Sequence, residues 1–579
     1  MLPFSEYPRP LLERSEWTNL NGSWRYAITQ TSDIPRSYDG DILVPYSPEA
    51  PFSGVGRQLM PGEFLHYHRA FTPPQGSGGR VLLHFGAVDY ACEVYVNARF
   101  AGRHAGGYLP FTLDVTKLIS DGENTLSLVV SDPSDTGHQA RGKQKLHRGG
   151  MYYTAQSGIW QTVWMERVAD AYMSAVSITP NFSAKTVSIR VTMGEGHAKG
   201  VKLSIIAEGK TVAACVTDDN GAATADLSAA FFPWSPETPF LYDVIAEHPQ
   251  GDSIRSYFAM RAFGREIDKA GLWRFTLNGK PFLPNGLLDQ GYWPEGLYTP
   301  PSDAAMVRDI QTMKDMGFNL LRKHIKIEPQ RWYYHCDRLG MIVWQDMVCG
   351  GGKYADWFVT TAINVVPALL RRFPDGPLTR KLFARTDAKE RDLYYKELEA
   401  MIRLLGNHPC IGGWVPFNEG WGQFDAKKAT ALVRALDPQN RPIDEASGWF
   451  DQGGGDMYSV HNYFYPLRVK AKKDRVWALT EFGGIAYPYP DHCSEEKVYG
   501  YGTAKSQQEL TERFRKLMLE TIKPQLKKGL AALVYTQVSD VEDEVNGLLT
   551  YDRKIEKIAI SDVKKINDAL YEEFERCVK

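Results

Sequence analysis

The sequence predicts a multidomain chain in which a jelly-roll β-sandwich and an immunoglobulin-like β-sandwich precede a (β/α)8 TIM barrel. The chain has 579 residues, enough for about three or four domains of ordinary size. In its first half, short runs of alternating apolar and polar residues are separated by Gly, Pro and Asp clusters, a pattern typical of sandwiches. In its second half, short apolar runs alternate with helical patterns, as in a barrel of β/α units.

Residues 1–168 are expected to form the jelly roll. The apolar run at 81–85 indicates a short strand, and residues 92–97 and 126–130 alternate with the period of two that a half-buried strand requires. Turn-forming residues gather between these runs, for example at 73–79. Many short strands with such punctuation favour a jelly roll or a related sandwich.

Residues 169–267 are expected to form the second sandwich, because the runs at 187–191 and 201–205 alternate cleanly. About 100 residues of this pattern suit an immunoglobulin-like domain. The rest of the chain, 268–579, is expected to form the barrel. It contains eight strand candidates, at 281–287, 319–321, 341–344, 411–417, 441–444, 456–461, 475–480 and 529–536.

Helical patterns follow most of these strand candidates. Met306, Ile310 and Met313 share one helical face. A helix is predicted over 386–406, where apolar residues recur at helical spacing up to a terminal Gly406. The largest insertion, 349–385, breaks the β/α rhythm, and so long a loop is typical of a functional or mobile segment.

The active sites of such barrels lie at the carboxyl ends of the strands. Polar residues at the predicted strand ends are Asp289, His324, Asp346, Asn418, Glu419, His461, Tyr463 and Glu481. A single glutamate in such a place is more often solvated or ion-paired. Here two mostly apolar runs, 414–418 and 477–480, each lead directly into a glutamate. Two carboxyl groups at one barrel mouth are what glycoside hydrolysis requires, one to protonate the leaving oxygen and one to attack or to activate water.

At these residues the chain resembles glycoside hydrolase family 2, the family of the β-galactosidases and β-glucuronidases. Eight segments carry the resemblance, at 67–71, 94–97, 106–111, 157–161, 234–239, 241–242, 318–324 and 336–340. Each segment is weakly specific, but their order across three domains is strongly specific. The resemblance spans essentially the whole chain, and it implies a sugar-binding-like first domain and a catalytic barrel.

The resemblance also implies roles for single residues. Glu419 corresponds to the general acid/base and Glu481 to the nucleophile. Tyr463 resembles the tyrosine that hydrogen-bonds the nucleophile, and Asn418 the asparagine that contacts the sugar 2-hydroxyl. Further candidates for substrate binding are His324, Asp289, Asp346, His461, Trp449 and Trp421.

The mechanism implied by the family retains anomeric configuration, so the carboxyl groups of Glu419 and Glu481 should lie about 5–5.5 Å apart. Glu419 must hold a proton until the leaving oxygen takes it. A dry site and a negative neighbour should therefore raise its pKa towards about 6–7. The expected activity is removal of a terminal sugar through a covalent glycosyl-enzyme.

The sequence leaves several alternatives for the glycone. Family β-glucuronidases bind the sugar carboxylate with an Asn-x-Lys pair, and the corresponding loop here carries Glu544 and Asn546. A glutamate there would repel a uronate, so β-galactosidase-type action on a neutral sugar is expected first. The alternatives are β-glucuronidase, for which Lys323, Lys326 or Lys353 could replace the missing lysine, and another family activity such as α-L-arabinopyranosidase.

Other function classes lose support. Motifs of phosphate-binding loops, serine-hydrolase elbows and zinc proteases do not occur in the sequence. No metal or other cofactor is expected, because the divalent-cation ligands of large family β-galactosidases are not identifiable. A non-catalytic carbohydrate-binding protein is a further alternative, although such a protein would be expected to have lost one of the two glutamates.

Charge and cysteine content limit the binding partners and the cellular compartment that we expect. Lys and Arg number 67 against 69 Asp and Glu, so no charge imbalance indicates nucleic acid or an acidic membrane surface. No apolar run long enough for a transmembrane helix occurs, and residues 1–17 lack the apolar core of a secretory signal. Seven cysteines without a Cys-x-x-Cys pair favour reduced thiols in a cytoplasmic protein. The expected partners are a carbohydrate substrate and further copies of the chain in a homo-oligomer.

Overall fold

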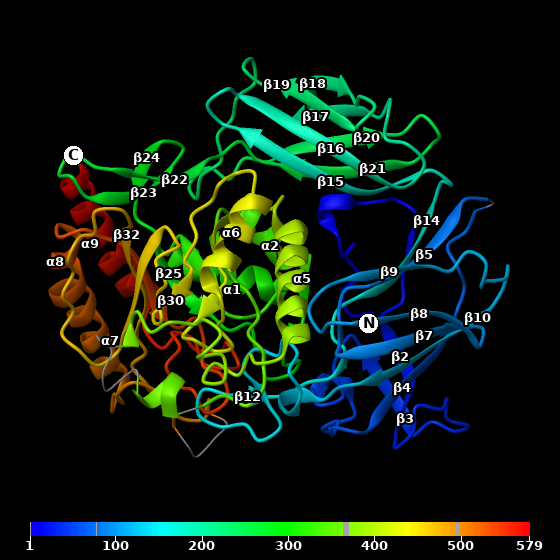
Figure 1. Cartoon of the computed structure of the whole chain (residues 1–579), viewed down its shortest axis with the longest axis horizontal. Coiled ribbons are helices and arrows are strands. Elements are labelled where there is room, and N and C mark those ends of the chain that lie inside the picture. Colours follow the sequence, from blue (N-terminus) through cyan, green and yellow to red (C-terminus); the bar gives the residue numbers. More distant parts are fainter. Residues whose placement is uncertain (1, 77, 356, 363–369, 494–497) are drawn as a thin grey trace.

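The computed structural model describes residues 2–76, 78–355, 357–362, 370–493 and 498–579, with the side chains of 360–362 left out. The chain forms two β-sandwiches and a barrel (Figure 1). The first sandwich and the barrel lie side by side, and the second sandwich lies across the top of both in this view. The three predicted fold types are therefore present in the predicted order.

The first sandwich has a six-stranded and a four-stranded sheet, in the orders β3-β2-β4-β10-β7-β8 and β1-β14-β5-β9. Their strands are β1 (Trp17–Asn19), β2 (Gly22–Thr29), β3 (Gly40–Val44), β4 (Phe64–Phe71), β5 (Arg80–Phe85), β7 (Ala91–Val96), β8 (Arg99–Ala105), β9 (Phe111–Asp114), β10 (Asn124–Ser131) and β14 (Val163–Val168). Alternate side chains of the facing sheets, such as Leu126 and Leu128, are fully buried in a common core. This burial explains why alternating runs in the sequence indicate these strands.

Shorter elements complete this domain. They are the 3-10 turns η1 (Pro10–Leu12), η2 (Pro51–Ser53) and η3 (Ser134–Thr136), and the strands β6 (Val88–Asp89), β11 (Gln144–Lys145), β12 (Tyr153–Thr154) and β13 (Gly158–Ile159). β11 pairs with β12 in parallel, and β13 pairs with β6 in antiparallel. The β11–β12 pair belongs to a segment that leaves the sandwich and crosses to the barrel.

The second sandwich packs a three-stranded sheet, β15-β16-β19, on a four-stranded sheet, β18-β17-β20-β21. Its strands are β15 (Tyr172–Asn181), β16 (Thr186–Glu195), β17 (Lys202–Ala207), β18 (Lys210–Val216), β19 (Ala222–Asp226), β20 (Tyr242–Glu247) and β21 (Ser253–Phe258). The expected strand runs at 187–191 and 201–205 lie in β16 and β17, and their alternate side chains fill the core between the sheets. All strand pairings in this domain are antiparallel.

A small antiparallel sheet leads into the barrel. It consists of β22 (Phe263–Ile267), β23 (Trp273–Leu277) and β24 (Lys280–Phe282). Phe263 and Phe275 pack with Leu288, Leu320 and Trp344 in one buried cluster, so this sheet covers one end of the barrel. Because Lys280–Phe282 pairs with β23, the predicted first barrel strand at 281–287 begins too early, and the barrel strand itself starts at Asn285.

Seven parallel strands form a curled sheet in the order β28-β27-β26-β25-β33-β32-β31. They are β25 (Asn285–Asp289), β26 (Leu320–Lys323), β27 (Ile342–Asp346), β28 (Ile411–Val415), β31 (Met457–Asn462), β32 (Val476–Gly483) and β33 (Leu530–Thr536). Almost every residue of these strands is buried, as expected for parallel strands that helices cover. The predicted TIM barrel is confirmed in this sheet.

The fifth barrel position differs from the predicted strand at 441–444. The segment there forms one isolated bridge, Ile443 to Trp414, and the Asp456 N–H donates to the Ile443 carbonyl from the other side, 2.8 Å away. Pro442 has no N–H to donate, which limits a regular ladder at this point. Pairing resumes with β29 (Phe417–Asn418) and β30 (Ala446–Ser447), so a broken strand closes the barrel between β28 and β31.

Helices surround the sheet (Figure 1). They are α1 (Asp303–Asp315), α2 (Gln330–Leu339), α5 (Ala388–Leu405), α6 (Ala426–Leu436), α7 (Gln507–Lys516), α8 (Lys523–Leu526) and α9 (Ile560–Val578), with π-helical η4 (Trp357–Ala362) and η5 (Leu517–Ile522). The Ser302 hydroxyl caps α1 by accepting from the Ala305 N–H, and Met306, Ile310 and Met313 form its buried face. The predicted helix at 386–406 is α5, capped by the Asp387 side chain.

Residues 137–157 of the first domain reach the mouth of the barrel. The N–H groups of Arg141 and Gly142 donate to the Cys349 carbonyl, at 2.9 and 3.0 Å. The Tyr153 hydroxyl donates to Glu544, in the loop after β33. The first sandwich therefore supplies part of the wall at the carboxyl ends of the barrel strands.

The insertion 349–385 also packs into the mouth. Its described side chains form one apolar cluster with loop residues of the barrel, comprising Ile325, Cys349, Tyr354, Phe358, Val359, Leu370, Phe383, Ala384, Trp421, Trp449 and Phe450. Residues 356 and 363–369 of this insertion lie outside the described residues. Two tryptophans that were expected near the site, Trp421 and Trp449, are thus held by the insertion.

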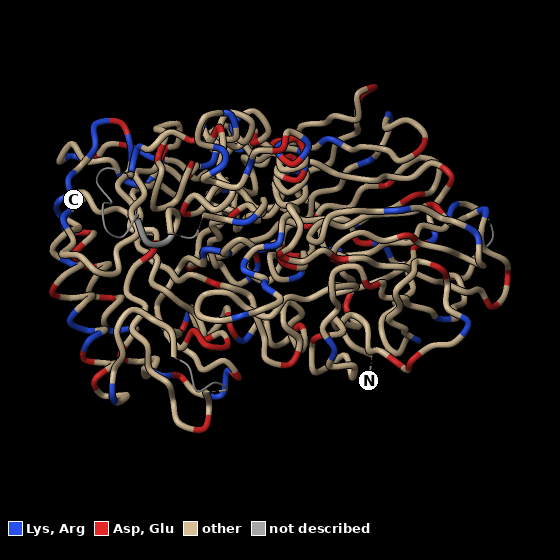
Figure 2. The backbone as a smooth tube through the Cα atoms, turned by 60° about the horizontal axis from the view of Figure 1, so that its bottom comes forward, with Lys and Arg blue, Asp and Glu red and all other residues tan. Residues whose placement is uncertain are grey.

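Basic and acidic residues are interspersed along the chain, and neither sign gathers on one face in Figure 2. Among the described residues, none of the helices is both long and apolar enough to cross a membrane.

Candidate active site

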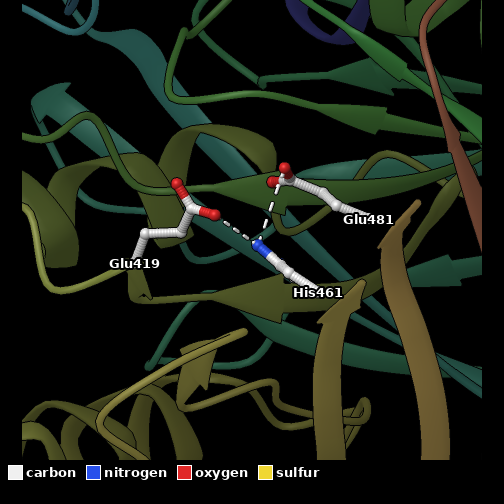
Figure 3. Close-up of side chains that lie close together, drawn as sticks. All are labelled: Glu419, His461 and Glu481. Atoms are coloured by element: carbon white, nitrogen blue, oxygen red, sulfur yellow. Dashed lines mark hydrogen bonds and ion pairs between the residues drawn. The ribbon is translucent and has the colours of Figure 1, made fainter. Parts of the chain in front are cut away.

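Three side chains meet at the mouth of the barrel: Glu419, His461 and Glu481 (Figure 3). The His461 Nδ1 lies 2.7 Å from Glu419 Oε1 and 3.6 Å from Glu481 Oε2. One carboxylate oxygen from each glutamate and an imidazole nitrogen all lie within 4.8 Å of one another. The two carboxyl groups therefore lie close to each other, and the imidazole of His461 contacts both.

Irregular backbone places both carboxyl groups. Glu419 follows β29 and has φ of 51°, a left-handed conformation that is uncommon for a residue with a side chain. Its N–H donates to the Ser447 carbonyl at 3.0 Å, which ties it to β30. In β32, the pairing register shifts around Glu481 on both sides, against β31 and β33. Such shifts are typical beside active sites, because they redirect a side chain out of the regular pleat.

Arg322 of β26 connects the site residues. Its Nη1 donates to Glu481 Oε1 at 3.1 Å and its Nη2 to Asn418 Oδ1 at 2.8 Å. A two-bond pair with Asp346 of β27, at 2.9 and 3.0 Å, holds the guanidinium itself. His324 Nδ1 lies 2.9 Å from the same Asp346 carboxylate. Asp346 is completely buried and its oxygens are engaged, so it orients Arg322 and His324.

Tyr463, just after β31, donates its hydroxyl to Glu481 Oε2 at 2.7 Å. The same hydroxyl lies 2.9 Å from Thr536 Oγ1. The Tyr463 ring stacks on the ring of Tyr501, with centroids 3.6 Å apart. Glu481 is thus oriented on one oxygen by a guanidinium and on the other by a phenol.

Burial sets the protonation of several groups in the site. It raises the pKa of Glu419, although the positive charges of Lys143 and Arg322 act against this rise. Burial lowers the pKa of His461 to about 3, so its imidazole is neutral near neutral pH. Burial also lowers the pKa of His324 well below its usual value. The site therefore combines a carboxyl group whose pKa is raised with two imidazoles whose pKa values are lowered.

Several polar groups of the site have no partner among the described residues. The Trp449 Nε1 donates to Glu419 Oε1 at 3.2 Å, whereas Oε2 of that carboxyl remains free. The Trp421 indole N–H and the Asn418 amide nitrogen are buried without an acceptor. Trp421 also stacks with Tyr152, at 5.8 Å between centroids. Buried donors without partners are costly unless a ligand satisfies them.

Other residues that the sequence indicated lie elsewhere. The Asp289 carboxylate accepts from Lys323 Nζ at 2.7 Å, and this lysine also pairs with Glu328, in a charged cluster beside the mouth. Among the described residues, no contact links Asp289 to the paired glutamates. Two further tryptophans of the barrel domain also lie away from the paired glutamates. Trp344 packs in the cluster that closes the far end of the barrel. Trp293 packs under a guanidinium, that of Arg553, 4.2 Å from the ring centroid.

The loop after β33 brings Glu544 close to the site, with 2% of its surface exposed. One of its oxygens accepts from the Tyr153 hydroxyl. The other accepts from the Asn546 amide at 3.0 Å. Both oxygens of this carboxylate are therefore engaged by the protein.

Sequence reasoning assigned no site role to Arg322, Tyr501 or Lys143. Arg322 had a signal, because it is a charged residue inside the apolar run of β26. Tyr501 and Lys143 lie in segments without periodicity, and Lys143 belongs to another domain. No pattern along the chain could have placed these two at the barrel mouth.

Glu419, His461 and Glu481 are also the described residues whose donor atoms are close enough to hold a metal ion. A carboxylate pair with an imidazole is an acceptable donor set for several divalent cations. In the arrangement described here, however, the same atoms are joined to one another and to Tyr463 and Arg322.

Three family models match successive parts of the chain. The sugar binding domain of glycosyl hydrolases family 2 matches residues 62–165, a second domain of that family matches 171–261, and its TIM barrel domain matches 273–466. The matches follow the two sandwiches and the barrel in order. They reach β31 but end before β32, which carries Glu481.

Curated relatives are similar over about two thirds of the chain. A putative beta-glucuronidase of Formosa agariphila is 28% identical over 397 residues, which is 65% of this chain and 47% of that protein. A beta-galactosidase of Thermoanaerobacter pseudethanolicus is 24% identical over 429 residues, 71% of this chain and 52% of that protein. The chain thus spans about half the length of these two relatives.

Solved structures share the fold over almost the full length. A beta-glucuronidase of Ruminococcus gnavus aligns with a TM-score of 0.74 and 15% identity, over 98% of this chain and 99% of that one. A beta-galacturonidase of Eisenbergiella tayi, bound to galacturonate, aligns with a TM-score of 0.70 and 16% identity, over 99% of both chains. At such identities the likeness shows the fold alone. With the three consecutive family models, it establishes that the chain belongs to glycosyl hydrolases family 2.

Proposed function

We propose that the protein is a retaining exo-β-glycosidase in which Glu419 is the general acid/base and Glu481 the nucleophile. The observation that carries this proposal is the approach of the two carboxyl groups, which have oxygens within 4.8 Å of each other. Retaining enzymes hold their carboxyl groups about 5–5.5 Å apart, whereas inverting enzymes need about 6.5–9.5 Å to admit a water. The observed spacing supports direct attack by one carboxylate.

In the first step, Glu481 attacks the anomeric carbon and Glu419 donates its proton to the leaving oxygen. The raised pKa of Glu419 suits this donation near neutral pH. Once Glu481 is bonded to the sugar its charge is lost, and Glu419 gives up a proton more readily. Glu419 then removes a proton from water, which hydrolyses the glycosyl-enzyme.

The surrounding residues support each step. Arg322 and Tyr463 aim the two Glu481 oxygens, so that the nucleophile is oriented before substrate arrives. Asn418 presents to the site an amide N–H that has no acceptor among the described residues, in keeping with a contact to a sugar hydroxyl. The rings of Trp421 and Trp449 can form walls on either side of the sugar.

Two glycone classes remain candidates, each with its own observation. Glu544 and Asn546 stand where the resemblance expects the Asn-x-Lys pair of the family β-glucuronidases, and a glutamate there favours a neutral sugar. Lys143, a lysine of the first domain without a carboxylate partner in the described chain, lies at the same mouth and favours a uronic acid. The relatives do not decide between these classes, because one is named a putative beta-glucuronidase and another a beta-galactosidase.

The test is the initial rate of hydrolysis of nitrophenyl β-galactoside, β-glucuronide, β-glucoside, β-mannoside and α-L-arabinopyranoside, with Glu481→Gln as the blank. We expect a rate on at least one sugar that is absent in the blank, and a first product that keeps the anomeric configuration of the substrate. An unchanged rate in Glu481→Gln, or release of the α-anomer from a β-glycoside, would contradict the proposal.

A further inference from the structure

Lys143 is the exception among the buried lysines of this protein. Within the described residues, the lysines that expose less than a tenth of their surface are Lys143, Lys323, Lys326 and Lys557. Lys323 and Lys326 both pair with Glu328, at 2.8 and 2.9 Å. Lys557 pairs with Asp540 at 2.8 Å. No carboxylate or other acceptor of the described chain contacts the Lys143 ammonium.

Aromatic rings flank this ammonium. Lys143 Nζ lies 5.4 Å from the ring centroid of Tyr153 and 5.9 Å from that of Trp421. Such contacts stabilise a cation only partly, because a ring is a weaker partner than a carboxylate. A nearly buried charge without a counter-ion is costly, so its place usually has a purpose.

The ammonium belongs to the active-site mouth rather than to the sandwich core. Its neighbour Gly142 is bonded to the Cys349 carbonyl after β27, and its aromatic neighbour Trp421 follows Glu419 by two residues. The charge of Lys143 is close enough to lower the pKa of Glu419 and of His324. It therefore lies within reach of a sugar held between the two glutamates.

We propose that Lys143 binds a carboxylate on the glycone, so that the substrates are β-uronides. This assignment rests on the proposed function, since it needs a sugar between Glu419 and Glu481. Lys143 would act as a specificity-determining residue that supplies, from the first sandwich, the cation missing from the loop after β33. A carboxylate beside it would receive charge-assisted hydrogen bonds that a hydroxymethyl group cannot match.

The other candidate residues do not compete for this role. Lys323 and Lys326 are engaged by Glu328, and Lys353 is exposed on the insertion. Glu544 keeps its charge, but Tyr153 and Asn546 hold both of its oxygens, so neither oxygen is free to contact the glycone.

The experiment compares sugars that differ only at C6. The nitrophenyl β-glucuronide is paired with the β-glucoside, and the β-galacturonide with the β-galactoside. The ratio of kcat/KM for each uronide to its neutral partner is measured in the wild type, Lys143→Met and Lys143→Arg. Lys353→Met, which removes the same charge from an exposed lysine, is the matched control, and thermal melting verifies folding.

We expect the wild type to prefer a uronide and Lys143→Met to lower the uronide-to-neutral ratio by about 10- to 100-fold, mainly through KM. Lys143→Arg keeps the charge and should restore much of the ratio. Lys353→Met should leave it unchanged. A further pair, 4-carboxyphenyl and phenyl β-galactoside, places the carboxylate on the aglycone, and Lys143→Met should affect both alike.

Three results would overturn the assignment. One is a parallel loss on uronides and neutral glycosides in Lys143→Met, which would make Lys143 a support of the acid/base or of the fold. The second is a wild-type preference for neutral sugars, which leaves the glycosidase proposal intact. The third is an effect that follows the carboxyphenyl aglycone instead of the glycone.

Failure of the proposed function is distinguishable, because no glycoside would then be hydrolysed. In that case, calorimetric binding of glucuronate and galacturonate, compared with glucose and galactose, decides the role of Lys143. Tighter binding of the uronates that is lost in Lys143→Met would support it, and equal binding of acid and neutral sugars would contradict it.

Discussion

Glu419 and Glu481 are the same residue type in one pocket, but they have different neighbours, in keeping with the two roles that we propose for them. Glu481 accepts from a guanidinium and a phenol. Glu419 meets a neutral imidazole and an indole N–H, and burial raises its pKa. Under the proposed function, the environment of each carboxyl group separates proton donation from nucleophilic attack, as in other paired-carboxyl sites.

The acid role of Glu419 predicts a dependence on the leaving group. In Glu419→Ala, kcat/KM for a substrate with a poor leaving group should fall by about 10²- to 10⁴-fold. The loss should be much smaller for a dinitrophenyl glycoside, whose phenolate departs without a proton. Added azide should accelerate the variant by attacking the glycosyl-enzyme, and the azide product should have the β configuration. Equal losses on both leaving groups would show that Glu419 does not donate the proton.

The proposed role of Glu419 as the acid also predicts a pH dependence. Activity needs the proton, so it is present below the pKa of Glu419 and lost as the pH rises through it. Burial raises this pKa, whereas the bond from Trp449 lowers it. Trp449→Phe removes that bond, so the pKa should rise further and the alkaline limb of kcat/KM should move to higher pH. A limb that stays in place or moves to lower pH would assign it to another group.

At the scale of the elements, the apolar runs located the strands because parallel strands are buried on both faces. The runs that lead into the two glutamates correctly placed Glu419 just after a strand, whereas β32 continues through Glu481 to Gly483, past the predicted end at 480. The sequence did not predict that the fifth strand is broken. Pro442 interrupts its ladder, and in the described structure only Ile443 bridges to β28. The position of Lys143 at the barrel mouth could not be predicted either, because a contact between two domains produces no periodic pattern in the sequence.

Arg322 of β26 hydrogen-bonds residues of three other strands, so even a substitution by lysine should affect activity and stability. A lysine cannot reproduce two bonds to Asp346 together with bonds to Glu481 and Asn418. Arg322→Lys should lower kcat at least about 10²-fold through misplaced site groups. It should also lower stability by about 1–3 kcal/mol, since the lysine keeps the charge but leaves a buried acceptor without its donor.

Denaturant unfolding and steady-state kinetics measure both effects. The control is Arg403→Lys, at an exposed pair with Glu399 one helical turn away, which should change stability by less than about 0.5 kcal/mol. Full activity in Arg322→Lys would mean that Glu481 and Asn418 do not depend on the guanidinium for their orientation.

At the scale of the whole molecule, the first sandwich completes the mouth of the barrel. Segment 137–157 carries Lys143 and Tyr153 to the loops after β27, β29 and β33. If Lys143 binds the glycone as proposed, recognition of the sugar depends on how the two domains are held together, and not only on the barrel. A contact between these domains should couple stability to substrate affinity.

Tyr153→Phe tests this coupling. It removes the hydroxyl that donates to the buried Glu544, and an orphaned buried acceptor costs about 1–3 kcal/mol. The melting midpoint should fall, and KM should rise more than kcat falls, because the segment that positions Lys143 loosens while Glu419 and Glu481 keep their own partners. Tyr551→Phe is the matched control: its buried hydroxyl has no partner among the described residues, so its removal should leave the midpoint unchanged or higher. Equal behaviour of the two variants would mean that the Tyr153 bond does not hold the sandwich to the barrel.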